Sequence, residues 1–170
     1  MLLVDADLRR PTLHEGLKVS NSWGLCDLLC SNDPINQIGV SGLVRHTDVQ
    51  GLDVLPSGRM QKDPTHLLYS ARVVELFERL RREYDVVLVD TAPMMLLADA
   101  RMLGRIADGA VLVLRAGHTT LAQAQVAVQR LAEDGTRVLG TVLNGWDPNT
   151  ASGTDYADSY SEYKKKITEI

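Results

Sequence analysis

Four short runs of apolar residues constrain the fold of this chain more than any other feature. They are rich in Val, Ile and Leu, and they lie at residues 2–4, 86–89, 110–114 and 138–143. Continuous apolar strands of this kind suit a parallel sheet that is covered on both faces, because neither face then meets water. The runs therefore predict the strands of a mostly parallel sheet.

Helical patterns lie between these runs, at residues 63–84, 98–106 and 120–133. Asp63-Pro64 reads as an N-cap followed by Pro at the first helical position, and Gly135 follows the last periodic residue of the third pattern. The segment 41–58 instead predicts two short strands joined through Asp48 and Gly51. The alternation predicts an α/β fold with helices on both faces of the sheet.

Composition limits the class of protein. With 170 residues, of which 45% are hydrophobic, the chain can bury one good core, and a net charge of −4 argues against a general nucleic-acid binder. Without a signal peptide or a run of about 18 apolar residues, we expect a soluble cytosolic chain that reaches a membrane only through a partner. Cys26 and Cys30 have no second metal-binding pair, so we expect both to be reduced, buried thiols.

Three aspartates follow two of the apolar runs. Asp5 and Asp7 come at the end of run 2–4, and Asp90 ends run 86–89. Because the carboxyl ends of parallel strands meet at one edge of a sheet, we expect the three carboxylates to gather there, where they would suit Mg²⁺. An Asp at such a place can also be only a helix N-cap, which is the alternative for each residue taken singly.

These stretches carry a resemblance to a known family. LLVDADLRRPTLH resembles the Walker A′ motif of the bacterial tyrosine kinases, which are P-loop-type kinases of capsule and exopolysaccharide synthesis, and VVLVDTAP resembles their Walker B motif. The likeness continues, in order, through GLCDLL, LDVLPSG, DPTHLL, LADARMLGRIADGAVLVLRAGHTT and VLGTVLNGWD. It implies a P-loop NTPase-like fold, with ATP and Mg²⁺ as cofactors.

The resemblance also implies roles for single residues. Asp7 and Asp90 would hold Mg²⁺ on the nucleotide phosphates, and Asp5 would be the base for an incoming tyrosine hydroxyl, although the split of roles between Asp5 and Asp7 stays open. Arg9 would contact phosphate oxygens or form a surface salt bridge. Asn144 would contact adenine, whereas by residue chemistry alone its Asn-Gly pair is a turn.

Residues 147–170 read as a flexible tail that contains Tyr156, Tyr160 and Tyr163. By resemblance these tyrosines are autophosphorylation sites reached by a neighbouring copy; the alternative is an amphipathic helix docked on the domain. The resemblance further implies a homo-oligomer and a membrane adaptor of the polysaccharide co-polymerase type. The chain would then lie at the inner membrane, through that partner or through a missing N-terminal segment.

The phosphate-binding motif GxxxxGK[ST] of this family does not occur in the sequence. Residues 1–146 are therefore interpreted as the carboxyl-terminal part of a kinase domain that lacks the P-loop strand and helix. We expect the chain by itself neither to bind ATP tightly nor to phosphorylate tyrosine. Two other hypotheses remain: a partition or septum-placement ATPase of the same superfamily, and a non-catalytic, pseudokinase-like docking module.

Overall fold

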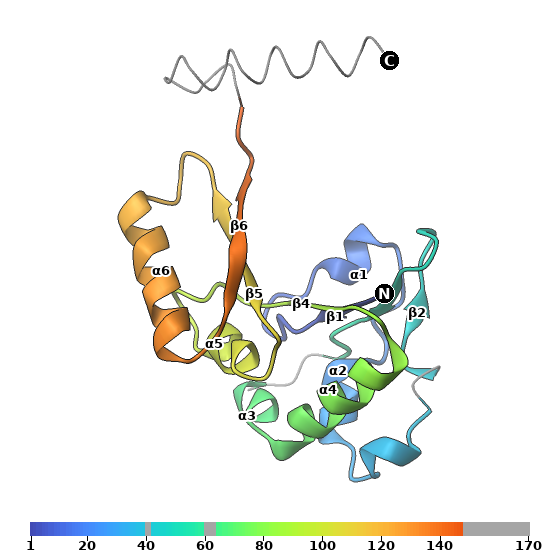
Figure 1. Ribbon diagram of the computed structural model, residues 1–170. Coiled ribbons are helices and arrows are strands. Elements are labelled where there is room, and N and C mark those ends of the chain that lie inside the picture. Colours follow the sequence, from blue (N-terminus) through green and yellow to red (C-terminus); the bar gives the residue numbers. More distant parts are fainter. Residues whose placement is uncertain (40–41, 60–63, 148–170) are drawn as a thin grey trace. The chain divides into compact units, whose positions relative to one another are not determined.

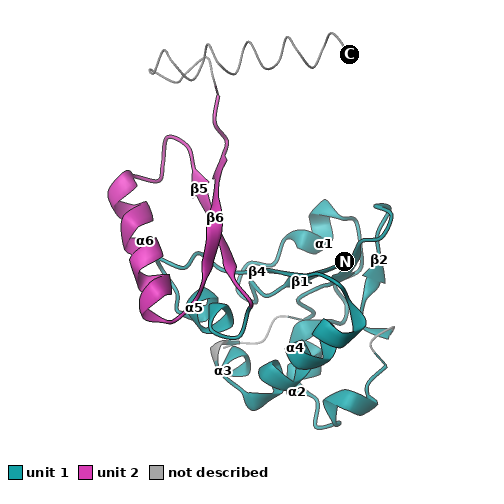
Figure 2. Ribbon diagram, in the orientation of Figure 1, with its two compact units in different colours: residues 1–107 teal, residues 108–170 magenta. Residues whose placement is uncertain are grey.

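The computed structural model describes residues 1–39, 42–59 and 64–147 (Figure 1). The chain divides into two compact units, residues 1–107 (unit 1) and 108–170 (unit 2), shown in Figure 2. In the described ranges every helix is too short or too polar to cross a lipid bilayer. The predicted tail lies almost entirely outside the described residues, so the predicted boundary after residue 146 stays a prediction.

Unit 1 contains a four-stranded, mostly parallel sheet. Its strands are β1 (Leu2–Asp5), β2 (Arg45–His46), β3 (Asp53–Leu55) and β4 (Val87–Asp90), in the order β2-β3-β1-β4. β1 pairs in parallel with β3 and with β4, whereas β2 and β3, the two short strands predicted in segment 41–58, pair with each other in antiparallel fashion. The first two predicted strands are thereby confirmed. β4 is an edge strand of this sheet among the described residues.

The helices of unit 1 are short, apart from one. They are α1 (Leu13–Gly16), α2 (Leu25–Cys30), η1 (Ile35–Gln37), α3 (Thr65–Leu68), α4 (Ala71–Glu83) and α5 (Asp99–Gly104). α1 lies on one side of the sheet, and α2 and α4 lie on the other (Figure 1). Helices on both faces agree with the predicted α/β class.

The prediction of a single helix over residues 63–84 is wrong, because the chain breaks it into α3 and α4. Ser70 has extended backbone angles, and its Oγ donates a hydrogen bond of 2.7 Å to the carbonyl oxygen of Leu67. A serine hydroxyl that bonds to nearby backbone competes with the helical pattern. Pro64 precedes α3 as its N-cap residue instead of opening its first turn, and Asp63 lies outside the described residues.

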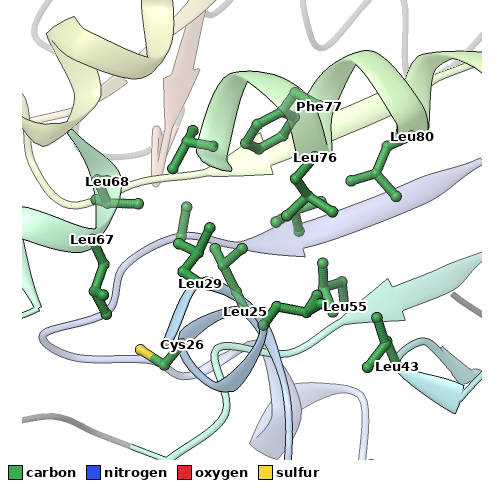
Figure 3. Packing of buried hydrophobic residues seen from close by; sticks show 14 of the residues in the cluster. Leu25, Cys26, Leu29, Leu43, Leu55, Leu67, Leu68, Leu76, Phe77 and Leu80 are labelled. Atoms are coloured by element: carbon green, nitrogen blue, oxygen red, sulfur yellow. The ribbon is translucent and has the colours of Figure 1, made fainter. Parts of the chain in front are cut away.

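The core of unit 1 lies between the sheet and the helices α2 and α4 (Figure 3). α4 presents Val73, Leu76, Phe77 and Leu80, spaced for one helical face, and all four are buried. Each such side chain contributes about 1.5–3 kcal/mol relative to an exposed position. This packing, more than helix propensity, explains why α4 is the longest helix of the unit.

The two cysteines differ in their surroundings. Cys26 is buried in the core of unit 1, as predicted, but Cys30 is exposed, so the prediction that both are buried is wrong. Cys30 is the last residue of α2, beyond the turn that faces the core. Within the described residues, neither cysteine forms a disulfide bond.

A loop at residues 56–58 packs against the start of α2. A Cβ on Gly24 would lie 2.1 Å from the carbonyl oxygen of Pro56, so only glycine fits there. The backbone N–H of Leu25 donates to Pro56 O, and that of Cys26 donates to Ser57 O, each at 2.8 Å. The loop therefore accepts bonds from backbone N–H groups at the start of α2, which have no partner within the helix.

Unit 2 is smaller and contains β5 (Ala110–Arg115), α6 (Leu121–Glu133) and β6 (Val138–Asn144). The two strands pair in parallel, and the predicted helix and both predicted strands are confirmed. α6 begins at Thr120 with a capping box, in which Thr120 Oγ1 accepts from the N–H of Gln123 at 3.2 Å. The capping residues Thr120 and Gln123, three positions apart, therefore mark the start of this helix in the sequence itself.

Candidate active site at the carboxyl ends of β1 and β4

Asp5 is the last residue of β1 and is fully buried. Its Oδ2 accepts a hydrogen bond of 3.2 Å from the backbone N–H of Leu13, at the start of α1. Its Oδ1 is also buried and has no hydrogen-bond partner in the part of the chain that the structure describes. Burial raises the pKa of Asp5 from 3.8 to about 6, and repulsion from Asp90 and Asp7 adds to the increase.

Asp90 lies beside Asp5 on the neighbouring strand. The two residues are register partners in the parallel pair of β1 and β4, and the N–H of Ala6 donates to Asp90 O at 2.8 Å. Register partners on adjacent strands point to the same face, with about 4.8 Å between strands. Asp90 is exposed, yet partial desolvation and repulsion from Asp7 raise the pKa of its carboxyl.

Asp7 shapes the loop that follows β1. Its Oδ1 accepts hydrogen bonds from the backbone N–H groups of Arg9 and Arg10, at 3.2 and 3.0 Å. This is the side-chain turn that Asp commonly forms with residues two and three positions ahead. The structure thus brings together Asp5, Asp7 and Asp90 as predicted, and we call these three residues the acidic rim.

Arg9 is engaged with a partner that the sequence interpretation missed. Its Nε donates to Asp99 Oδ2 at 3.0 Å, and the Asp99 side chain is only 5% exposed. Asp99 opens α5, where it reads in the sequence as an ordinary first-turn acidic residue. A buried carboxylate requires a cation or donors, but burial at this position could not be read from the sequence.

Burial and neighbouring carboxylates raise the pKa of the two strand-end aspartates of the acidic rim. The groups that set the pKa of Asp5 and Asp90 are burial, backbone N–H donors and other carboxylates, and no guanidinium is among them. Arg9 pairs with Asp99, although Arg9 lies only two residues after Asp7 in the chain. The two alternatives for Arg9, contact with phosphate oxygens and a surface salt bridge, stay predictions, since the observed pair is with a buried carboxylate.

The rim fits Mg²⁺ only together with ligands from outside the protein. In the described part of the chain, no group of three or more His, Cys, Asp or Glu side chains is arranged to hold a metal alone. Mg²⁺, however, is usually bound by one or two carboxylates together with water and substrate phosphates. The buried, unpartnered Oδ1 of Asp5 and the repulsion between the carboxylates are what a cation at this place would relieve.

The other predicted site residues lie elsewhere. Asn144 ends β6 in unit 2, is exposed, and accepts a hydrogen bond from the N–H of Ala116 at 2.9 Å. Because the two units are described separately, its proposed contact with adenine stays a prediction. The three tail tyrosines Tyr156, Tyr160 and Tyr163 lie outside the described residues.

Comparison with known proteins decides the family. The chain is 36% identical over 166 residues to the tyrosine-protein kinase YwqD of Bacillus subtilis, and the match covers 98% of this chain and 68% of that protein. The chain belongs to the bacterial tyrosine-protein kinase family. It is also 36% identical over 145 residues to the tyrosine-protein kinase Etk of Escherichia coli, where the match covers 85% of this chain but only 19% of Etk. No family model matches the sequence.

Solved structures agree with this family. The kinase domain of Escherichia coli Etk superposes with a TM-score of 0.80 at 34% identity, covering 91% of this chain and 59% of that domain. The septum site-determining protein MinD of Pyrococcus horikoshii, solved with Mg-ADP, has a TM-score of 0.67 at 22% identity, over 93% of this chain and 63% of that one. The MinD likeness shows the shared P-loop NTPase fold alone. The family's relatives are named kinases, which favours the kinase hypothesis over the septum-placement alternative.

Proposed function

We propose that this chain forms the acidic half of the active site of an ATP-dependent protein tyrosine kinase. The observation that carries the proposal is a buried Asp5, with its pKa raised to about 6, beside Asp90 at the carboxyl ends of two parallel strands. A general base works best when its pKa lies near the working pH. The other half, a phosphate-binding loop, has no counterpart in the 170 residues.

In the proposed reaction, Asp7 and Asp90 hold the Mg²⁺ that accompanies the nucleotide, and this ion would neutralise charge on the phosphates. Asp5 accepts the proton of an incoming tyrosine hydroxyl. The tyrosine oxygen then bonds to the γ-phosphorus of ATP, while the bond between that phosphorus and the bridging oxygen breaks and ADP leaves. The raised pKa of Asp5 predicts that the rate falls as the pH drops below about 6, where this base becomes protonated.

The acceptors that we propose are Tyr156, Tyr160 and Tyr163, phosphorylated in one copy by the active site of another. Each phosphate would add about −1.5 to −2 charges, so a phosphorylated tail would be repelled by the acidic rim and released. We further propose a membrane adaptor of the polysaccharide co-polymerase type as partner, and a place at the inner membrane through it. The process served would be capsule or exopolysaccharide synthesis.

Joining this chain to a strand and helix that carry a GxxxxGK[ST] loop provides a test of the site. In that protein, Asp90→Asn should reduce phosphotyrosine formation at least about 1,000-fold, because a ligand of the metal is lost. Asp85→Asn is the matched control, since Asp85 is exposed and precedes the same strand at its opposite end. Full turnover in Asp90→Asn, measured by phosphotyrosine mass spectrometry, would remove Asp90 from the mechanism.

The acceptors are tested separately. Replacing Tyr156, Tyr160 and Tyr163 with Phe should remove most autophosphorylation and leave activity on an added tyrosine peptide. Phosphate mapped to Tyr69 or Tyr84 would contradict the assignment of the tail. Hydrolysis of ATP with no phosphotyrosine on any substrate would instead favour the septum-placement type of ATPase, and loss of both activities would favour a docking module.

A further inference from the structure

In the part of unit 2 that the structure describes, one face of the two-stranded sheet is open. Leu112 of β5 is buried, whereas Val111 and Val113 on either side of it are exposed. Side chains alternate between the two faces of a strand, so both valines point away from the face to which Leu112 points. Val142 of β6 is the register partner of Val113 and is exposed too. We call Val111, Val113 and Val142 the open face.

Gly140 leaves a shallow place in the open face. It lies two residues before Val142 in β6 and is the register partner of Val111, so it belongs to the same face of the sheet. A Cβ on Gly140 would meet no atom of the described residues within 4 Å. Aromatic rings pack well over strand glycines and beside β-branched side chains. The open face therefore suits a partner that carries aromatic rings.

The tail supplies such rings at helical spacing. Its apolar residues follow one another at intervals of four, three and four positions, as Tyr156, Tyr160, Tyr163 and Ile167. In an α-helix these intervals bring the side chains to one face, whereas the acidic and basic residues between them fall mostly on other sides. The four residues lie outside the described part of the chain, so the pattern is a property of the sequence.

The tail also begins beside the open face and has a matching length. β6 ends at Asn144, so the tail leaves unit 2 from an end of this same sheet. A helix over residues 156–170 would be about 22 Å long. β6, with seven residues, spans about 23 Å. Residues 147–155 can reach about 30 Å when extended, which is enough for the chain to reverse its direction.

We propose that the tail docks as an amphipathic helix on the open face of its own chain, with its tyrosine rings over Gly140 and against the valines. The tyrosine hydroxyls would lie at the edge of this contact, because a tyrosine has an apolar ring and a polar tip. The docking deepens the proposed function and rests on it in one respect, since it takes the three tail tyrosines to be the acceptors. A docked tail is withheld from the active site of another copy.

Docking would make phosphorylation of the tail cooperative. A phosphate adds about −1.5 to −2 charges, and an apolar contact offers it neither donors nor water, so one phosphorylated tyrosine prevents docking. The two remaining tyrosines then become available to another copy. The tail would thus pass from an unphosphorylated, docked form to a multiply phosphorylated, free form.

The experiment is NMR of the full chain at low concentration, without nucleotide. Nuclear Overhauser effects should connect ring protons of the tail tyrosines with methyl groups of Val111, Val113 and Val142. Amides of residues 157–166 should exchange about tenfold more slowly than in Tyr160→Asp, which places a charge against the valines and should abolish the contact. Tyr160→Phe should keep it. Dilution should change neither measurement, because the contact lies within one chain.

Ser161→Asp is the matched control, because it adds the same charge one position along, about 100° around the helix and away from the valines. Loss of docking in both aspartate variants would overturn the proposed orientation. Absence of the Overhauser effects in the wild type would overturn docking, and effects that disappear on dilution would mean that a second copy covers the open face. Contacts of the valine methyls with residues outside the tail would overturn it as well.

The regulatory role has its own test. Val113→Asp charges the open face and lies outside the acidic rim, so it should release the tail. When this variant is the substrate of the chain joined to a phosphate-binding loop, its first tail phosphorylation should be about tenfold faster than that of the wild-type substrate. An equal rate would overturn the regulation. The NMR experiment involves no turnover, so its failure leaves the proposed function standing, whereas failure of the tyrosine-to-Phe test would remove the acceptors and leave the contact.

Discussion

Unit 1 and unit 2 are built from the same kinds of element, yet they bury their apolar residues very differently. In unit 1, β1 and β4 lie against α2 and α4, and side chains such as Leu2, Val4 and Leu80 are fully buried. In the described part of unit 2, the buried apolar side chains are Leu112, Ala127 and Leu131. A two-stranded sheet with one helix is marginal by itself, so unit 2 has little to hold it in isolation.

The exposed residues of unit 2 lead to the same conclusion. Val111, Val113 and Val142 are 53%, 61% and 49% exposed, although apolar strands of this kind normally belong inside a covered sheet. In unit 1 the edge strand β4 also has an exposed apolar residue, Leu88, which is 49% exposed. In the described part of both units, apolar strand residues are thus left exposed, and in unit 2 more of them than in unit 1.

The largest expected effect comes from separating the two units. Residues 1–107 expressed alone should retain a cooperative fold, whereas residues 108–147 alone should be unfolded, because their few buried side chains cannot offset the conformational entropy lost on folding. Circular dichroism and amide NMR spectra of the two fragments provide the measurement. Cooperative thermal unfolding of the 108–147 fragment would contradict the conclusion that unit 2 is unstable by itself.

The same substitution in the two units should give unequal losses of stability. Leu80→Ala removes a fully buried side chain from the core of unit 1 and should cost about 2–5 kcal/mol. Leu139→Ala, at a position of β6 that is 59% exposed, should cost less than about 1 kcal/mol. Urea unfolding of both variants against wild type measures the difference, and similar losses would mean that β6 is covered in solution.

The sequence predicted the strands well, and physical reasons explain where it failed. The strands at residues 86–89 and 110–114 were evident because they are continuous apolar runs, and α6 was evident from its cap and its period. The break at Ser70 was missed because the apolar period continues across it, and only the side-chain bond to Leu67 O reveals it. Helix propensity alone does not distinguish one helix over residues 63–84 from the two helices α3 and α4.

The candidate site was predictable in part for similar reasons. Asp5 and Asp90 were found because strand ends in a parallel sheet share one edge, which is a consequence of topology. Asp99 was missed because its importance depends on burial and on the distant Arg9, and neither is encoded locally. The placement of Asn144 relative to the rim depends on how the two units pack, which local pattern does not specify.

The buried carboxylate of unit 1 provides a third, smaller test. Because the pKa of Asp5 in the folded chain is about 6, above its ordinary value of 3.8, the folded state binds the extra proton and this group destabilises the fold as pH rises from about 4 to 6. Asp5→Asn removes the charge, so it should stabilise the chain at pH 7.5 by up to about 3 kcal/mol and have little effect at pH 3.5. Urea unfolding at the two pH values measures this. Equal effects at both would show that burial does not raise this pKa.

The smallest expected effect concerns the interactions that stabilise the long helix of each unit. The N-cap residue of α4 is Ser70, whose side chain forms no cap bond, so this helix relies on its buried face. The N-cap residue of α6 is Thr120, which forms a capping box, and α6 has few buried side chains. Thr120→Ala should therefore cost about 1 kcal/mol and speed amide exchange in the first turn of α6 about fivefold. Thr120→Ser, which keeps a hydroxyl acceptor for the N–H of Gln123, should exchange at nearly the wild-type rate. If Ala and Ser at position 120 gave equal exchange, local capping would not be what holds α6, and tertiary contacts of unit 2 would have to be stronger than its buried residues indicate.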